Sequence, residues 1–368
     1  MNQISNNDTY YKQKYLKYKK KYLELKQYGG TECESKKDRF NQTILSVDEL
    51  KELKKFSAYD LRRLPSWCDR ILYRTIITDP KLKDIFKIES EQYNSYVNNT
   101  IIKSDHDLVY GVFNITIPGL TPQIKVLIVT WNQANQNPII DDVLDENFFS
   151  QMSPSYVNFE SFDIICIAQQ ESSMYDSFIN IFDTTDSLQR SIINKYDNDA
   201  NLTKNYIIQH AKTGSPKFYV RETILIKKSI FKSTYEIRTH SQCLKLPVCS
   251  KSICGIGFTF KIDNKSPFTL NFFATHMPIN TSDPDLGLEL RINTSKEIID
   301  FIKIHFTTGN INTINQIDFI SGDLNFRYNI GSIEGDQLKS IMKEKKAFID
   351  FNEAEIIFNP TCKKNPCN

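Results

Sequence analysis

The feature that most constrains the fold is a series of apolar, strand-like runs that each lead to a polar side chain. Four such runs lead to Asn132, Glu171, His276 and Asp323. They are rich in β-branched and aromatic residues, which is typical of buried strands. Buried strands that end in this way predict polar side chains converging at one edge of a sheet. The runs cover residues 124–131, 162–171, 268–277 and 317–326.

Further segments fit around these strands. Residues 113–117 and 124–131 flank a short turn-rich link, which predicts a β-hairpin. Another strand is predicted over 255–262, and helical periodicity covers 284–306 and 335–347. No second linker interrupts this run of strands and helices. We therefore expect one α+β domain over residues 46–368, a length sufficient for one large core.

Residues 1–30 differ from the rest of the chain in charge. They hold seven lysines against Asp8 and Glu24, whereas the whole chain has 46 basic and 44 acidic residues. Apolar or aromatic residues recur every three or four positions from Tyr11 to Leu25, and glycines follow, which predicts a basic amphipathic helix. Through residues 10–27 this helix could contact an anionic membrane or a partner. The alternative is a solvated appendage or short coiled coil; residues 31–45 read as a linker.

The composition limits the partners and the compartment. The eight cysteines form no CxxC pair, which argues against a structural zinc site, and several lie in apolar runs where a free thiol behaves as a small hydrophobe. With no signal peptide and no apolar stretch near 18 residues, we expect a reducing, intracellular protein, soluble or peripherally membrane-associated. The slightly acidic body predicts no nucleic-acid partner. The oligomeric state stays open.

The polar strand ends suit a divalent cation and a phosphate group. Mg²⁺ takes one or two carboxylates and keeps waters, and Glu171 is the best candidate ligand. Asp323 and Asn325 are two residues apart, so on a strand they share a face. Asp323 could then hold a water nucleophile while Asn325 contacts the phosphate. Taken alone, the "GDLN" segment also fits an Asx turn, and Glu171 a structural strand end.

Taken together, these motifs resemble those of the inositol polyphosphate 5-phosphatases, which belong to the endonuclease/exonuclease/phosphatase superfamily. Residues 348–363 also resemble that family. The resemblance implies a four-layer α/β/β/α sandwich with two packed mixed β-sheets. In the family, the motifs that "PSWCDRIL" and "SDH" resemble come after all the others. In this chain they come first, which implies a circularly permuted catalytic domain. The motifs are "VTWN" (129–132), "AQQE" (168–171), "ATHM" (274–277), "SGDLNFR" (321–327), "PSWCDRIL" (65–72) and "SDH" (104–106).

The resemblance also implies roles for individual residues. Glu171 would bind Mg²⁺ with help from Asn132, and Asp105 would support the metal side. Asp323 would orient and deprotonate the attacking water. The scissile phosphate would be held by Asn325, His276 and His106, and Asp69 would pair with His106. Phosphate or scaffold contacts are implied for Arg70 and Arg327, and substrate contacts for Arg63, Lys363 and, as a stand-in for a family basic residue, Arg62.

The activity implied is Mg²⁺-dependent removal of the 5-phosphate from a phosphoinositide or a soluble inositol polyphosphate. One alternative is a nuclease or other phosphodiesterase of the same superfamily. Another is a catalytically degenerate module that binds phosphoinositide. The resemblance makes a geometric prediction: Asp69, His106, Glu171 and Asp323 converge in space, and residue 63 approaches residue 363.

Overall fold

The computed structural model describes most of the chain between residues 67 and 361. The N-terminal helix and linker predicted before residue 46 lie outside the described residues, as does the helix predicted over 335–347 except for its last residue. Arg62, Arg63, Arg327 and Lys363 lie outside them too. The described ranges are 67–83, 86–96, 104–117, 121–134, 146–156, 158–172, 205–214, 219–244, 249–260, 267–279, 284–307, 315–326, 347–358 and residue 361.

The described residues form strands with a few helices between them. The strands are β1 (Asp69–Ile77), β2 (Lys87–Tyr96), β3 (Leu108–Ile117), β4 (Thr121–Asn132), β5 (Ile164–Ser172), β6 (Tyr206–Thr213), β7 (Tyr219–Lys227), β8 (Thr234–Cys243), β9 (Ser252–Phe260), β10 (Phe268–His276) and β11 (Asn315–Asp323). The helices are α4 (Pro80–Lys83), α6 (Glu146–Met152), the 3-10 turn η2 (Phe159–Ser161), α10 (Lys228–Phe231) and α11 (Pro284–Phe306). The predicted hairpin is confirmed as β3–β4, and the predicted helix 284–306 as α11.

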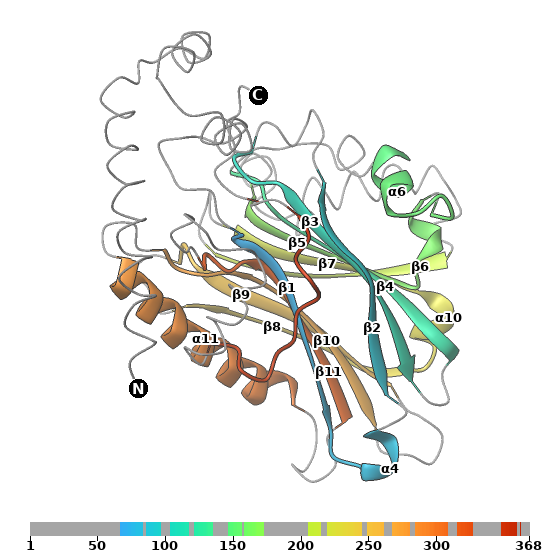
Figure 1. Cartoon of the computed structure of the whole chain (residues 1–368). Coiled ribbons are helices and arrows are strands. Elements are labelled where there is room, and N and C mark those ends of the chain that lie inside the picture. The colour runs from blue at the N-terminus through green and yellow to red at the C-terminus, as the bar shows by residue number, and fades with distance from the viewer. Residues whose placement is uncertain are drawn as a thin grey trace, which may run out of the picture.

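Two mixed sheets pack face to face, which confirms that part of the predicted architecture (Figure 1). One sheet has the strand order β1-β11-β10-β9-β8, and the other β2-β3-β4-β5-β7-β6. Each contains one parallel pair, β10 with β11 and β4 with β5, and the remaining pairs are antiparallel. The two parallel pairs matter for function because β4, β5, β10 and β11 are the strands that carry the polar ends.

Aromatic side chains fill the space between and outside the sheets. Phe319 of β11 stacks on Phe272 of β10 and lies 5.1 Å, ring centre to ring centre, from Phe113 of the opposite sheet. Burying each such ring contributes about 2–3 kcal/mol. The long helix α11 covers the outside of the five-stranded sheet, where its Phe306 packs edge-on against Phe273. The short helix α6 packs through Phe148 on the other sheet.

Segments from the two ends of the described chain lie side by side. β1, blue in Figure 1, pairs along its whole length with β11, and the red C-terminal segment runs next to it. Trp67 donates its indole N–H to the carbonyl of Phe358 at 2.9 Å. The backbones of Tyr73 and Asn352 exchange two hydrogen bonds. The first and last described segments are therefore parts of one folded unit.

Arg70 belongs to this tie between the ends of the chain. Its guanidinium is buried and forms an ion pair with Glu353, whose carboxylate also accepts a hydrogen bond from the Tyr93 hydroxyl at 2.7 Å. These are contacts of a scaffold residue. The sequence left a phosphate contact or a scaffold contact open for Arg70; in this structure the guanidinium has the scaffold contact with Glu353, and a phosphate contact stays a prediction.

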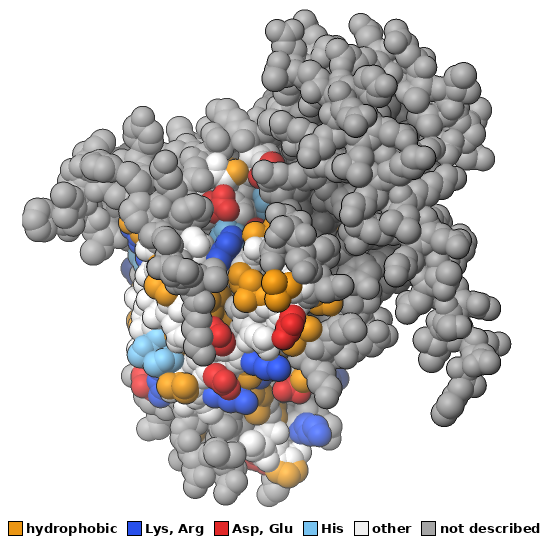
Figure 2. Space-filling view, turned by 90° about the vertical axis from the view of Figure 1, so that its left-hand side faces the viewer, with side chains coloured by type: hydrophobic (Ala, Val, Ile, Leu, Met, Phe, Trp, Pro, Cys, Tyr) orange, Lys and Arg blue, Asp and Glu red, His pale blue; other side chains and the backbone are white. Residues whose placement is uncertain are grey.

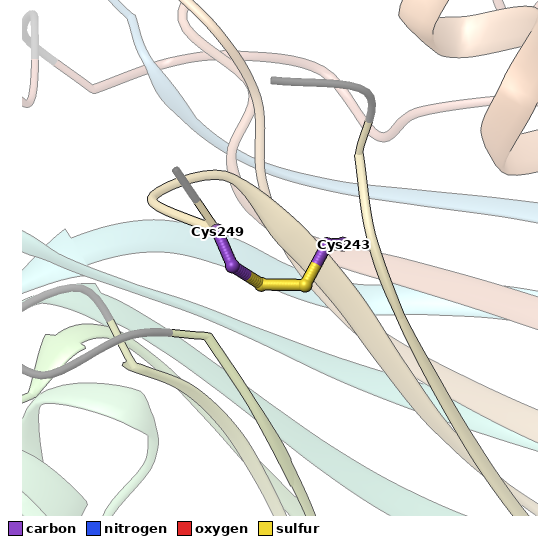
Figure 3. The surroundings of a disulfide bond; sticks show 2 residues. All are labelled: Cys243 and Cys249. Atoms are coloured by element: carbon purple, nitrogen blue, oxygen red, sulfur yellow. A yellow bond between two sulfur atoms is a disulfide. The ribbon is translucent and has the colours of Figure 1, made fainter. Parts of the chain in front are cut away.

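Cys243 and Cys249 form a disulfide across the turn between β8 and β9 (Figure 3). The sequence analysis predicted no disulfide, so this pairing is a finding of the structure. Cys243 is the last residue of β8, and Cys249 follows it after the five residues LKLPV, a spacing that by itself predicts no pairing. Cys166 and Cys254 are free thiols, and both they and Cys68 are buried, as expected for small hydrophobes.

The surface offers two further observations. On the face shown in Figure 2, acidic, basic and apolar side chains of the described residues are interspersed, and neither sign of charge dominates. Among the described residues, no helix combines the length and apolar character needed to cross a membrane.

Candidate active site

The polar strand ends meet at one edge of the sandwich. Parallel pairing aligns the ends of β10 and β11, so His276 lies directly beside Asp323. Antiparallel pairing places Asp69, the first residue of β1, on the other side of Asp323. In the opposite sheet, the parallel strands β4 and β5 end together at Asn132 and Gln170, just before Glu171. The fold thus brings residues from the beginning, middle and end of the chain to one place.

Asp69 and His106 form a buried pair. The Nδ1 atom of His106 lies 2.8 Å from Oδ2 of Asp69, and the hydroxyl of Thr361 donates to the same oxygen at 2.8 Å. Ser104 orients the segment that carries His106, because its hydroxyl accepts from the His106 backbone and donates to the carbonyl of Asn132. The imidazole is thereby fixed with Nε2 facing Asp323, at 4.0 Å from its Oδ2.

Asp323 is the centre of the site. Its Oδ2 accepts a hydrogen bond from the Asn132 side-chain amide at 3.0 Å, across the gap between the sheets. The same oxygen lies 3.3 Å from Nε2 of His276. Its Oδ1 accepts from the backbone N–H of Asn325 at 3.0 Å. This last contact is the Asx turn that the sequence left open, so turn formation and site formation use the same carboxylate.

The charges around Asp323 are arranged to keep it ionised. Burial would raise its pKa, but the hydrogen bond from His276 and the positive charge of His106 outweigh burial and hold the pKa well below its usual range. Burial would likewise lower the pKa of His106, yet the Asp69 carboxylate raises it to about 9. At neutral pH the site therefore presents a carboxylate next to a charged imidazolium.

His276 lies in a different environment from His106. Its Nε2 contacts the ammonium group of Lys251 and lies 3.7 Å from Oε1 of Glu171. Burial and the nearby Lys251 lower the pKa of His276 despite the neighbouring carboxylates. The two histidines of the site thus differ: the pKa of His106 is raised, and that of His276 is lowered.

Two of the site residues have left-handed backbone conformations, which are uncommon for residues other than glycine. Glu171 has φ 48° and Asn325 has φ 52°. At Glu171 the β5–β7 ladder shifts register between Gln169 and Ser172, which turns the carboxylate out of the strand and leaves it 24% exposed. Such strain clusters at functional sites. The main chain is therefore bent to present both side chains.

The carboxylates at the rim of the site suit a hard divalent cation. Among the described residues, no three His, Cys, Asp or Glu side chains form a ready-made metal cage. Mg²⁺ does not require one, because it usually takes one or two carboxylates and keeps several waters. Glu171 and Asp105, with side chains 24% and 30% exposed, offer such oxygens at the surface of the site. Glu171, whose Oε1 lies 3.7 Å from Nε2 of His276, therefore fits a Mg²⁺ ion at the rim of the site.

The structure brings most of the predicted residues together. The Asp69, His106, Asn132, His276 and Asp323 side chains form one buried network, which the backbone N–H of Asn325 joins at Asp323, with Glu171 and Asp105 at its rim. The side-chain amide of Asn325 donates to the carbonyl of Met277 at 2.8 Å, so in this structure it is engaged by the protein. The predicted approach of residues 63 and 363 lies outside the described residues.

Two residues that contact the network, Thr361 and Lys251, were not predicted from the sequence. Thr361 lies in the segment "NPTCK", where the sequence predicted a substrate contact only for Lys363. A threonine in such a segment does not by itself predict a site residue. Lys251 lies in "SKSICGIG", just before β9, where a lysine alone predicts no contact with the site. Both lie outside the strands, so strand periodicity could not place them.

Fold and site together define a class of protein: two packed mixed sheets with a phosphoesterase-type cluster of carboxylates and histidines at one edge. The sequence profile described as endonuclease/exonuclease/phosphatase family 2 matches residues 129–367, well over half of the chain. The chain belongs to this family. Among curated proteins, none matches.

Solved structures with a distant likeness include several members of the same class. The inositol polyphosphate 5-phosphatase domain of SPsynaptojanin, in complex with inositol (1,4)-bisphosphate and calcium, is 13% identical, with 45% of each chain covered and a TM-score of 0.28. Truncated TDP2 of Caenorhabditis elegans is 13% identical over 48% of this chain and 54% of that one (TM-score 0.26). A family protein of Bacteroides thetaiotaomicron is 16% identical over 54% and 62% (TM-score 0.30). The chain thus spans about half the length of the first two structures.

Proposed function

We propose that this chain is a Mg²⁺-dependent phosphoric monoester hydrolase that removes the 5-phosphate from a phosphoinositide or a soluble inositol polyphosphate. The observation that carries the proposal is the arrangement around Asp323. An ionised carboxylate lies within 4.0 Å of Nε2 of both His106 and His276, with Asp69 behind His106. This grouping places a candidate water-binding carboxylate next to candidate phosphate-binding groups.

Each group has a defined task in this proposal. The Asp323 carboxylate, oriented by Asn132, holds and deprotonates the attacking water. The imidazolium of His106 places positive charge next to the scissile phosphate, where electrostatic stabilisation of the transition state is strongest. His276 and Lys251 hold other phosphate oxygens. Mg²⁺ bound at Glu171 would supply further positive charge to the phosphate and the leaving oxygen.

The choice of a phosphatase over a nuclease is supported by sequence. The "PSWCDRIL" segment carries Asp69 in the form that resembles the 5-phosphatases, and the body of the chain is slightly acidic. A protein that binds long nucleic acid through its phosphates needs a basic face instead.

The test is a phosphate-release panel. Inositol polyphosphates, phosphoinositide vesicles and plain or abasic DNA would be incubated with the full chain, with and without Mg²⁺. The proposal predicts inorganic phosphate from at least one inositol substrate, dependent on Mg²⁺, and no DNA cleavage. Cleavage of DNA without phosphate release would establish the nuclease alternative, and binding without turnover would establish the degenerate binding module.

We also infer that the domain is circularly permuted. Two observations support this. The family profile covers residues 129–367, whereas β1 to β3, which complete both sheets, precede it. Thr361 also lies against Asp69, so the last and first described residues are neighbours where an unpermuted chain would be continuous. The β3–β4 link is correspondingly short, as expected where former chain ends were joined.

A further inference from the structure

Glu222 is a buried carboxylic acid that takes no part in the network around Asp323. It lies on β7, among the apolar side chains Val220 and Ile224 on the inner face of the six-stranded sheet, and its exposed fraction is 0%. Its Oε1 accepts a hydrogen bond from the thiol of Cys166 at 2.7 Å. Its Oε2 is buried, and none of the described residues donates a hydrogen bond to it. A charged carboxylate in this position would be poorly compensated.

The contacts of Glu222 span both sheets. Cys166 belongs to β5 of its own sheet, whereas Ala274, whose backbone N–H lowers the pKa of Glu222 against burial, belongs to β10 of the opposite sheet. Ala274 is two residues before His276, and its neighbour Ser321 is two residues before Asp323. Glu222 therefore lies between the two sheets, one layer of side chains further from the edge of the sandwich than His276 and Asp323.

This position matters because the active site is itself assembled from both sheets. The amide of Asn132 reaches Asp323 across the gap between the sheets. A change in sheet spacing one layer below would alter that contact directly. We propose that Glu222 is a positioning residue: a fully buried carboxyl group between the two sheets, beneath the site, that keeps Asn132 in contact with Asp323.

The electrostatics of the pocket agree with a neutral acid. Burial raises the pKa of Glu222 to about 8, against a weaker opposing effect of its hydrogen bonds to Cys166 and Ala274. The titratable groups that face it among the described residues are Cys166 and Cys254, and burial raises the pKa of both thiols. The described residues around Glu222 thus provide no countercharge, and ionisation above about pH 8 would leave a negative charge between the sheets.

The first experiment compares the pH dependence of unfolding by denaturant in the wild type and in Glu222→Gln, which mimics the protonated acid. From the ordinary pKa of 4.5 up to about 8, the folded state keeps a proton that the unfolded state releases, so this contribution to wild-type stability falls as pH rises. The stability of the Gln variant relative to the wild type should therefore rise over this interval and level off above it. A constant difference across the range would overturn the neutral assignment.

The second experiment measures kcat and KM against pH, and it rests on the proposed phosphatase activity. Wild-type kcat should fall with a midpoint near pH 8, and Glu222→Gln should move that midpoint upward with KM unchanged. Glu222→Leu removes the carboxyl group and its hydrogen bond with Cys166. This variant should lower kcat by about tenfold or more, since small misplacements of catalytic groups are costly. An unchanged alkaline midpoint in the Gln variant would overturn the positioning role.

A matched control separates positioning from general stability. Thr259 and Thr269 form another buried polar contact, at the opposite end of the five-stranded sheet. Thr259→Val should lower stability without moving the pH profile of kcat. Absence of turnover in the wild type would refute the proposed function instead, and the unfolding comparison would still decide whether Glu222 is neutral.

Discussion

At the residue scale, the Asp69–His106 pair carries the clearest electrostatic consequence. Two donors, His106 and Thr361, converge on Oδ2 of Asp69 at 2.8 Å each. The carboxylate in turn raises the pKa of His106 to about 9. The imidazolium is thus available throughout the neutral range, although a buried histidine without such a partner would be neutral.

Replacing Asp69 by Asn should remove this effect. The variant keeps the shape of the side chain but loses its charge, so the pKa of His106 should fall well below 9. The rate should then be lost at lower pH than in the wild type, and kcat at pH 8 should drop by about a hundredfold or more. A pH–rate profile together with an NMR titration of His106 measures both. Glu236→Gln, which breaks the partly exposed pair with Arg238, is the control and should change neither.

The polar side chains at the ends of strands were the part of the site that the sequence predicted best. The side chains at Asn132, Glu171, His276 and Asp323 were recognisable because each ends a buried strand. Lys251 and Thr361 were not, since a lysine or threonine outside a strand is common on any surface. Glu222 was hidden for a different reason: it occurs within a strand-forming run and gives no sign of which face it occupies.

At the element scale, the site depends on the close approach of β10 and β11. Gly322, immediately before Asp323, has φ 153°, and a Cβ atom there would lie 1.9 Å from the backbone oxygen of Thr275. Backbone cannot move aside as a flexible side chain can. Glycine at this position is therefore what allows the two parallel strands to deliver His276 and Asp323 side by side.

We expect Gly322→Ala to be strongly destabilising, by about 3 kcal/mol or more, because it combines a steric clash with an unfavourable backbone conformation. Gly111→Ala is the comparison: its nearest atoms belong to the side chain of Phe113, at 2.6 Å, which has room to adjust more cheaply than backbone. Denaturant unfolding of both variants measures the difference. Equal losses of stability would contradict the importance of the β10–β11 approach.

The strands were predictable only in part, and β2, β6, β7 and β8 were not predicted from the sequence. Strand alternation and apolar runs located β4, β5, β9, β10 and β11 to within a few residues, and helical periodicity gave the bounds of α11. The pairing of β1 with β11 could not be obtained in this way, because residues 69–77 and 315–323 are far apart in sequence. Only the family resemblance suggested that the two segments meet.

At the scale of the whole molecule, the proposed permutation makes a direct prediction. A chain cut between β3 and β4, at residues 118–120, would start at β4 and continue from residue 361 through a short linker into residue 67. Since Thr361 already contacts Asp69, the new junction should be unstrained. Circular dichroism and unfolding should show a folded protein with retained activity. Failure to fold with several linker lengths would contradict the inference.

The N-terminal segment makes a separate prediction at this scale. Each lysine close to an anionic surface contributes about 1 kcal/mol of attraction. Deleting residues 1–30, which hold seven lysines, should therefore lower activity on anionic phosphoinositide vesicles while sparing a soluble inositol polyphosphate. The same assay on neutral vesicles is the control. An equal effect on both substrates would refute a membrane role.

The central claim is that one composite site, with Asp323 at its centre, hydrolyses a phosphate monoester. The most direct measurement is kcat/KM for phosphate release from an inositol polyphosphate in Mg²⁺ by the wild type, Asp323→Ala and His106→Ala. The account predicts a loss of about a thousandfold or more for Asp323→Ala and a comparable loss for His106→Ala, with both variants folded. Turnover that is unchanged in either variant would contradict it.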